Sequence, residues 1–208
     1  MLRQLDLFAA PSIRFDASFR ELRRTELGLG AWVDYQPGWV TGHDALFDRL
    51  ERELAWQTET RRMYDRVVQT PRLLAIPPRT GLVEEMRLAL SARYRQELVH
   101  VTAALYRDGR DSVAWHGDTT ARDLLEALVV TVSLGEPRRF LLRPAEQAGA
   151  APRVARAWSL GRGDLIAMGG TCQRTWRHAV PKVAHAGPRI ALMFRPAWGR
   201  AYVERADR

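Results

Sequence analysis

The sequence of 208 residues contains very little cysteine and very little lysine. Cys172 is the single cysteine, which excludes an intramolecular disulfide bond and is typical of a protein from a reducing compartment. Lys182 is the single lysine, so all the other Lys and Arg positions are arginines. A bias of this strength also follows from a genome rich in G and C. No arginine therefore gains functional weight merely because it is not a lysine.

Long apolar runs are also missing. No stretch approaches the roughly 18 consecutive apolar residues of a membrane-spanning helix. The opening residues, MLRQLDLFAAPS, lack the apolar centre of a secretory signal. We therefore expect a monomeric cytoplasmic protein with no membrane partner. Repeats and low-complexity tracts are absent too, which predicts one domain over residues 1–208 with a sizeable core.

The charge balance of the chain favours a polyanionic partner. Lys and Arg number 32 against 24 Asp and Glu, which gives a formal charge of +8 at pH 7. This excess assists association with DNA or RNA, although it says nothing about the fold. Hydrophobic residues make up 46% and charged residues 27%, so the chain has an ordinary globular composition and not a disordered one.

The pattern of apolar residues changes along the chain. Helical spacing predicts helices over about 42–55 and 80–98, the second after a Pro77–Pro78 pair. Beyond about residue 100, short β-branched runs alternate with Gly, Pro and Asp, which is typical of a sandwich or barrel. These runs are 99–105, 112–115, 128–134, 139–142, 164–168, 178–180 and 189–194, with an exposed loop expected over 144–157. The prediction is therefore a mainly β (α+β) domain with its helices first.

Two candidate metal ligands stand two residues apart in the stretch SVAWHGDTT. Side chains at i and i+2 of a strand point the same way, so His116 and Asp118 share one face. His178, at the head of another predicted strand, supplies a third ligand. Two histidines and one carboxylate form the facial triad of non-haem Fe(II) oxygenases. A catalytic zinc ion with the same ligands is the alternative.

A pair of arginines helps to separate these two metals. Arg189 and Arg195 are six residues apart in RIALMFR, which places them on one face of a strand, while Ile190, Leu192 and Phe194 point to the core. A guanidinium binds a carboxylate through two hydrogen bonds. Inward arginines beside a metal therefore suggest the dicarboxylate 2-oxoglutarate as co-substrate. The alternative is that both are surface charges of an edge strand.

Taken in order, five motifs resemble the AlkB family of Fe(II)/2-oxoglutarate dioxygenases. They are YRDG…WHGD (106–109 and 115–118), VSLG (132–135), GDLIAMGG (163–170), WRH (176–178) and RIALMFR (189–195). The resemblance covers roughly residues 60–196. It implies a double-stranded β-helix (jelly-roll) core over about 99–196, N-terminal helices, a nucleotide-recognition lid over about 60–80, and an N-terminal extension over 1–20.

The same resemblance assigns roles to individual residues. His116, Asp118 and His178 would bind Fe(II), and O2 would be the second co-substrate. Arg189 would bind the distal carboxylate of 2-oxoglutarate, Arg195 would brace Asp118 or the metal-chelating end, and Tyr106 would contact the co-substrate.

The substrate contacts implied by the resemblance are Arg72, in a Pro-Arg-Leu segment of the lid, and Trp115. Members of the family carry an acid where this chain has Thr120, Asn where it has Ala104, and an aromatic residue after the Pro-Arg-Leu segment. Tyr64 or Met63 would replace that aromatic residue as the surface on which a flipped base stacks. Phosphate contacts are expected from arginines around the lid, namely Arg61, Arg62, Arg66, Arg72 and Arg79.

The resemblance implies oxidative removal of N-alkyl groups from the bases of DNA or RNA. Two alternatives stay open: an oxygenase that acts on a modified tRNA base or a protein side chain, and a nucleic-acid-binding protein with a structural metal. Separately, QLDLF (Gln4, Leu5, Asp6, Leu7, Phe8) is similar to the short peptide with which bacterial repair proteins bind the sliding clamp. The sequence therefore also predicts clamp docking through residues 4–8.

Overall fold

Most strands of the protein belong to two antiparallel sheets that pack face to face. The computed structural model describes residues 12–63, 66–118, 123–145 and 156–197, and only the backbone within 59–70. One sheet has eight strands in the order β2-β3-β12-β9-β14-β7-β6-β5, and the other has four in the order β11-β10-β13-β8. Their bounds are β2 Arg23–Gly28, β3 Ala31–Gln36, β5 Gln57–Met63, β6 Arg66–Ala75, β7 His100–Tyr106, β8 Val113–His116, β9 Val129–Gly135, β10 Arg138–Pro144, β11 Arg156–Leu160, β12 Asp164–Gly170, β13 Trp176–Val180 and β14 Arg189–Arg195. Two short strands, β1 (Arg14–Phe15) and β4 (Val40–Thr41), pair separately.

From β7 onward the chain passes repeatedly from one sheet to the other. β7, β9, β12 and β14 lie in the eight-stranded sheet, while β8, β10, β11 and β13 form the four-stranded sheet. This alternation of antiparallel strands between two sheets is the jelly-roll, or double-stranded β-helix, arrangement. It confirms the fold class predicted from the sequence.

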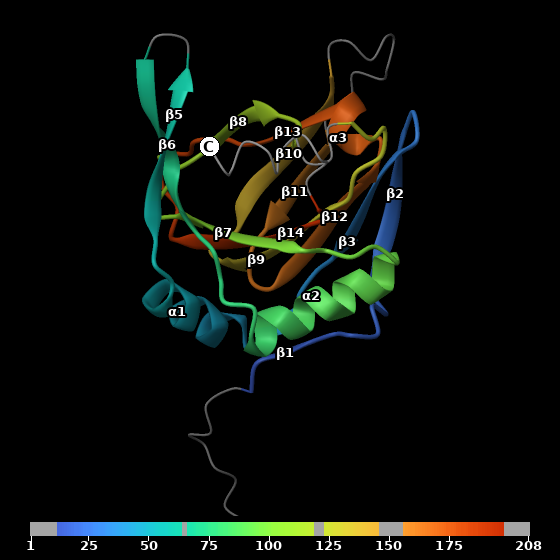
Figure 1. Ribbon diagram of the computed structural model, residues 1–208. Helices are drawn as coiled ribbons and strands as arrows, with labels where there is room; N and C mark the ends of the chain where they lie inside the picture. Colours follow the sequence, from blue (N-terminus) through green and yellow to red (C-terminus); the bar gives the residue numbers. More distant parts are fainter. Residues whose placement is uncertain (1–11, 64–65, 119–122, 146–155, 198–208) are drawn as a thin grey trace, which may run out of the picture.

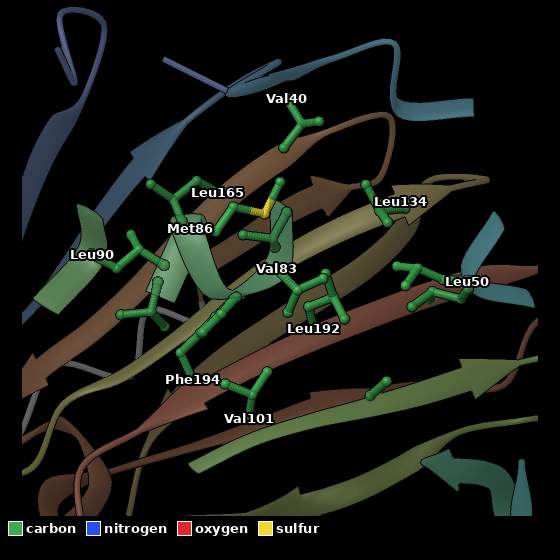
Figure 2. Packing of buried hydrophobic residues seen from close by; sticks show 14 of the residues in the cluster. Val40, Leu50, Val83, Met86, Leu90, Val101, Leu134, Leu165, Leu192 and Phe194 are labelled. Carbon is green, nitrogen blue, oxygen red and sulfur yellow. The ribbon is translucent and has the colours of Figure 1, made fainter. Parts of the chain in front are cut away.

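Two helices cover the outer face of the eight-stranded sheet. Figure 1 shows α1 (His43–Glu53) and α2 (Gly81–Tyr94) on the side away from the four-stranded sheet. Met86 and Leu90 of α2 are fully buried and pack in one hydrophobic cluster with Leu192 and Phe194 of β14 (Figure 2). Each such side chain contributes on the order of 2 kcal/mol through burial. The helices therefore fix β14 from one side and leave its other face to the space between the sheets.

The two faces of β14 confirm the alternation predicted for this strand. Ile190, Leu192 and Phe194 have no exposed surface and belong to the cluster beneath the helices. Ala191 belongs to a second cluster, between the sheets, and Met193 packs against it. Because side chains alternate along a strand, Arg189 and Arg195 extend into this second space.

The expectation that helices come first and strands afterwards was wrong. β2, β3, β5 and β6 precede α2 and belong to the large sheet, so this sheet extends well beyond residues 99–196. Most side chains of β2 are exposed, so its sequence RRTELG lacks the apolar alternation that marks a strand. The turn into β3 uses left-handed backbone at Leu29 (φ 55°) and Gly30 (φ 76°). β11 and the short helix α3 (Cys172–Thr175) were also not predicted.

The segment expected to form a lid contains the β5–β6 hairpin. This hairpin is the edge of the eight-stranded sheet, and Figure 1 shows it projecting past the body of that sheet toward the side of the four-stranded sheet. Its role as a lid stays a prediction. Among the helices that the structure describes, none has the length and apolar character needed to span a membrane.

Candidate metal centre and co-substrate site

Three predicted metal ligands meet at the end of the four-stranded sheet. His116 of β8 and His178 of β13 are directly paired in the register of these strands, and Asp118 follows β8 in the next turn. One ligand atom from each of these residues lies within 4.8 Å of the other two. In the described part of the chain they form the one group of three or more His, Cys, Asp or Glu side chains with this property.

The atoms of the three side chains that face one another are atoms that can bind a metal. Nδ1 of His116 lies 2.8 Å from the carbonyl oxygen of Ala114, so an N–H there donates to that oxygen and leaves Nε2 as the ligand atom. Nε2 of His116 lies 3.4 Å from Oδ1 of Asp118, and Nε2 of His178 lies 3.8 Å from the same oxygen. Two imidazole nitrogens and one carboxylate oxygen therefore converge on one point.

Arg195 holds the other carboxylate oxygen of Asp118. Its Nε and Nη2 both lie 2.8 Å from Oδ2, while Nη1 donates to Thr102 Oγ1 at 3.0 Å. Burial alone would raise the pKa of Asp118, but the charge of Arg195 outweighs burial and holds the pKa far below its usual range. The carboxylate therefore stays ionised, with Oδ2 occupied and Oδ1 directed at the histidines.

His178 is buried and neutral. Burial lowers its pKa to about 3 against the opposing effect of Asp118, and the charges of Arg195 and Arg72 act in the same direction as burial. The ring of Phe140 stacks on it with 5.4 Å between centroids. A neutral imidazole of fixed orientation can bind a metal without first losing a proton.

Residues of α3 hold the backbone of the ligand turn. The side-chain Oε1 of Gln173 accepts the N–H of Asp118 at 2.9 Å, and Nη1 of Arg174 donates to the carbonyl of Asp118 at 3.2 Å. Gly117 fits between the two ligands because a Cβ there would lie 2.5 Å from the carbonyl oxygen of Gln173. The position of Asp118 is thus fixed through its backbone as well as its carboxylate.

Arg189, at the opposite end of β14, is a buried cation with hydrogen-bonding capacity to spare. It is 2% exposed, its Nε donates to the carbonyl of Leu160 at 3.2 Å, and its Nη2 donates to Ser133 Oγ at 2.7 Å. Nη1 is buried and has no acceptor in the described residues. Burial lowers the pKa of this guanidinium. A carboxylate would satisfy the open donor and compensate the buried charge.

Tyr106 and Arg72 border the same space. Tyr106 is directly opposite Arg189 in the β7–β14 register, and the guanidinium carbon of Arg189 lies 5.1 Å from its ring centroid. Arg72 precedes Leu74 by two residues, and Leu74 packs in the cluster between the sheets, so alternation directs Arg72 to the same side. The Nε of Arg72 is buried and has no hydrogen-bond partner in the described residues.

The other predicted contacts lie elsewhere. Trp115 is adjacent to His116 in β8, so it points to the opposite face, where Arg143 stacks on its ring at 4.5 Å. Arg79 lies 3.9 Å from Glu84, whose carboxylate is bound more closely by Arg87, and its phosphate contact stays a prediction. Several predicted residues fall outside the described residues or side chains, and their roles stay predictions: Gln4, Leu5, Leu7, Phe8, Arg61, Arg62, Met63, Tyr64, Arg66 and Thr120.

The residues present fit Fe(II) and 2-oxoglutarate. Two imidazoles and one carboxylate are a donor set suited to Fe(II), and they leave further coordination positions open. The open Nη1 of Arg189 fits a distal carboxylate, because a guanidinium buried without an acid otherwise lacks compensation. A zinc site would use the same three ligands, but it would not explain why the guanidinium of Arg189 is buried without an acid.

The comparison with known families decides between these metals. The model of the 2OG-Fe(II) oxygenase superfamily matches residues 20–195, which is most of the chain. The chain belongs to this superfamily. Its members are 2-oxoglutarate-dependent dioxygenases, so the cofactors are Fe(II), 2-oxoglutarate and O2, as the sequence predicted.

Individual relatives place this 2OG-Fe(II) oxygenase near AlkB and confirm the resemblance seen in its motifs. It is 30% identical over 176 residues to alpha-ketoglutarate-dependent dioxygenase alkB homolog 3 of Bos taurus, covering 74% of this chain and 62% of that relative. It is 24% identical over 242 residues to DNA oxidative demethylase ALKBH2 of Arabidopsis thaliana, covering 93% and 76%. The solved structure of OsALKBH1 superposes with a TM-score of 0.51 at 16% identity, covering 84% of this chain and 100% of that one, which supports the fold. The chain spans less than two thirds of the alkB homolog 3 proteins that it matches.

Sequence reasoning missed the residues that position this oxygenase's functional groups. Ser133 binds Arg189, Gln173 binds the backbone of Asp118, and Thr102 binds Arg195. Ser133 and Thr131 stand two apart in the apolar strand VVTVSLG, and such alternating polar positions in a buried strand were the available signal. Gln173 offered no such pattern.

Proposed function

We propose that this protein oxidatively demethylates N-alkylated bases in DNA or RNA and releases formaldehyde. The observation that carries the proposal is the joint presence, between two jelly-roll sheets, of the His116–Asp118–His178 group and the open donor of Arg189. The names of the relatives supply the substrate class, since they include alkB homolog 3 and a DNA oxidative demethylase.

The chain's own residues would hold and orient the reactants. Fe(II), bound by His116, Asp118 and His178, would supply the oxidation of a C–H bond by O2, with 2-oxoglutarate giving up two electrons as it becomes succinate and CO2. Arg189 and Tyr106 would orient 2-oxoglutarate from the far end of the site. Arg195 keeps Asp118 ionised and directed at the two imidazoles.

The substrate base must enter this site alone, unstacked from its neighbours in the strand. A base stacked in a duplex is out of reach of a centre between two sheets, so the nucleotide is flipped out or comes from a single strand. Hydroxylation of the N-methyl carbon gives a hemiaminal, which breaks down to formaldehyde and the unmodified base. Arg72, whose Nε has no partner in the described part of the chain and whose charge acts on His178, would be an additional donor for the base or the co-substrate.

Mass spectrometry of methylated oligonucleotides tests the proposal. Oligonucleotides with 1-methyladenine or 3-methylcytosine, single-stranded and duplex, should lose 14 Da (about one methylene) per event, with an equal amount of formaldehyde. His178→Ala should abolish both signals. Turnover of 2-oxoglutarate without demethylation of any oligonucleotide would reject the proposal in favour of a modified tRNA base or a protein side chain.

Clamp docking through residues 4–8 is a separate proposal that rests on the sequence QLDLF. A labelled peptide of these residues should bind purified sliding clamp, and the Leu7→Ala and Phe8→Ala peptides should not. Equal binding by all three peptides, or binding by none, would reject it.

A further inference from the structure

Arg138, the first residue of β10, is a second buried cation at the co-substrate end of the site. It is 2% exposed. Phe140 and Leu142 of the same strand pack in the cluster between the two sheets, and side chains alternate along a strand, so Arg138 extends into that space as well. A buried charge is costly unless an acid compensates it, so this position needs an explanation.

Arg138 and Arg189 share two neighbours. The guanidinium carbon of Arg138 lies 5.8 Å from the ring centroid of Tyr106, and that of Arg189 lies 5.1 Å from the same centroid. Arg189 also donates to the carbonyl of Leu160, the residue directly opposite Arg138 in the β10–β11 register. The charge of Arg138 adds to the effect of burial in lowering the pKa of Arg189. The two guanidinium groups are therefore close enough for both charges to act on a ligand beside Arg189.

Backbone oxygens hold the guanidinium of Arg138 in place without compensating its charge. Its Nη1 donates to the carbonyl of Asp108 at 2.9 Å, and its Nη2 donates to the carbonyls of Asp111 at 3.0 Å and Pro181 at 2.8 Å. Its Nε is buried and has no hydrogen-bond partner in the described residues. Arg138 thus repeats the combination seen at Arg189, a fixed and buried guanidinium with one donor open.

The acids that act on the charge of Arg138 are each paired with another arginine. The carboxylate of Asp111 accepts hydrogen bonds from Nε and Nη2 of Arg107, both at 2.8 Å. The carboxylate of Asp108 accepts from Nε and Nη2 of Arg110 at 3.0 and 2.7 Å. Burial outweighs the two carboxylates and lowers the pKa of Arg138. Because each of these ion pairs is neutral overall, most of the charge of Arg138 stays uncompensated.

We infer that Arg138 is a second cation of the co-substrate site and that, together with Arg189, it selects a 2-oxo acid with a second carboxylate. The inference rests on the proposed position of 2-oxoglutarate beside Arg189 and deepens it. An acid that carried a methyl group in place of the distal carboxylate would leave two buried guanidinium groups without compensation, which is a larger penalty than one. The three backbone carbonyls keep the charge of Arg138 in place while the site is empty.

Anaerobic calorimetric titration of the full-length, Co(II)-loaded protein tests the inference by comparing 2-oxoglutarate with 2-oxovalerate, in which a methyl group replaces the distal carboxylate. The wild-type protein should prefer 2-oxoglutarate. Arg138→Met, which keeps the apolar stem, should reduce this preference about 10-fold, as expected for the loss of one charged interaction, and should leave the affinity for Co(II) unchanged. The matched control is Arg139→Met, because Arg139 is exposed on the opposite face of β10, and it should keep the wild-type preference.

The preference between the two acids is decisive, because a purely structural role of Arg138 would weaken the binding of both acids equally. An unchanged preference in Arg138→Met, or an equal loss in Arg139→Met, would overturn the inference. If Arg138→Met fails to fold, Arg138→Gln removes the charge but keeps a donor, and it carries the test with the same two outcomes. Arg138→Lys restores the charge and should retain most of the preference, and a loss as large as in Arg138→Met would overturn the role of the charge.

Failure of the proposals on which the inference rests would look different. If 2-oxoglutarate does not bind beside Arg189, then Arg189→Met will keep the wild-type preference between the two acids. If the protein does not demethylate nucleic acids, no methylated oligonucleotide will release formaldehyde, while the preference, which is measured without nucleic acid, will still depend on Arg138.

Discussion

The two ends of β14 carry the same residue in opposite situations. At one end, Arg195 is paired with the carboxylate of Asp118 and bound to Thr102. At the other end, Arg189 is more deeply buried, hydrogen-bonded to Leu160 and Ser133, and has no carboxylate partner in the described residues. Both side chains extend from one face of one strand.

The difference shows how a single strand serves two purposes. The charge of Arg195 is compensated inside the protein, so its effect is to fix a metal ligand. The charge of Arg189 has no acid to compensate it among the described residues, and we propose that 2-oxoglutarate compensates it on binding, which would recover the cost in stability. The metal end is therefore preorganised, and the co-substrate end depends on its ligand.

The largest expected effect comes from removing a ligand at the metal end. Asp118→Ala deletes the carboxylate on which both imidazoles converge, and affinity for Fe(II) or Co(II) should fall at least about 100-fold, beyond the 10–100-fold typical of groups behind the ligands. Anaerobic calorimetric titration measures it. Metal binding of wild-type strength in Asp118→Ala would place the metal elsewhere.

The next effect belongs to the co-substrate end. Arg189→Met keeps the apolar stem and removes the open donor, so the KM for 2-oxoglutarate should rise roughly 10–100-fold, as expected for loss of charge-assisted hydrogen bonds. Its affinity for the metal in the absence of 2-oxoglutarate should be unchanged. An unaltered KM in steady-state assays would show that another cation binds the distal carboxylate.

The two arginines should also differ in their effect on folding stability, and here replacement of Arg195 should have the larger effect. Arg195→Met leaves the part-buried Asp118 carboxylate without its cation, which should lower the free energy of unfolding by about 3 kcal/mol. Arg189→Met breaks no ion pair with a described residue. It should therefore change the free energy of unfolding by no more than about 1 kcal/mol. Urea unfolding of the metal-free proteins compares them. A larger loss for Arg189→Met would contradict the assignment of Arg189 as an uncompensated charge.

A smaller effect is expected from the backbone support of the metal end. Gln173→Met preserves the length of the side chain but removes the acceptor for the N–H of Asp118. Metal affinity should fall about 10-fold, as for other groups that orient a ligand. Gln173→Glu, which retains the acceptor, should stay closer to the wild type. Equal losses in both variants would indicate a packing role instead.

The pH dependence of the metal-free protein should include a contribution from the metal end, beside that of His100, whose pKa burial also lowers. The pKa of His178 is lowered from 6.5 to about 3, so between these values the unfolded chain binds a proton that the folded chain does not. The free energy of unfolding should therefore decrease as pH falls from 6.5, by up to about 1.4 kcal/mol per pH unit for one proton. Urea unfolding at pH 7 and pH 5 should show a slope that His178→Asn reduces. An identical slope in that variant would mean that His178 is not the responsible group.

Local patterns were sufficient to predict the functional strands. The spacing of His116 and Asp118, the six residues between Arg189 and Arg195, and the apolar residues between those arginines all follow from alternation along a strand. The structure brings Arg195 and the metal ligands together as expected, and it buries Arg189 at the other end of the same strand. The exposed strand β2 escaped prediction, because most of its side chains face solvent and no apolar periodicity marks it.

The supporting contacts could not be predicted for a different reason. Gln173 and Asp118 are 55 residues apart, and Ser133 and Arg189 are 56 apart. In the first pair one partner is a backbone N–H, which leaves no trace in the sequence, and the second pair depends on the order of strands in the sheet. Such contacts appear only once the strands are placed.

The most direct test of the central claim is an anaerobic titration that requires both ends of β14 at once. Fe(II) followed by 2-oxoglutarate should produce the weak visible absorption band of their joint complex in the wild-type protein. The band should need a much higher concentration of 2-oxoglutarate in Arg189→Met and should be absent in Asp118→Ala. No band in the wild-type protein, or an undiminished band in Asp118→Ala, would contradict the assignment of this site.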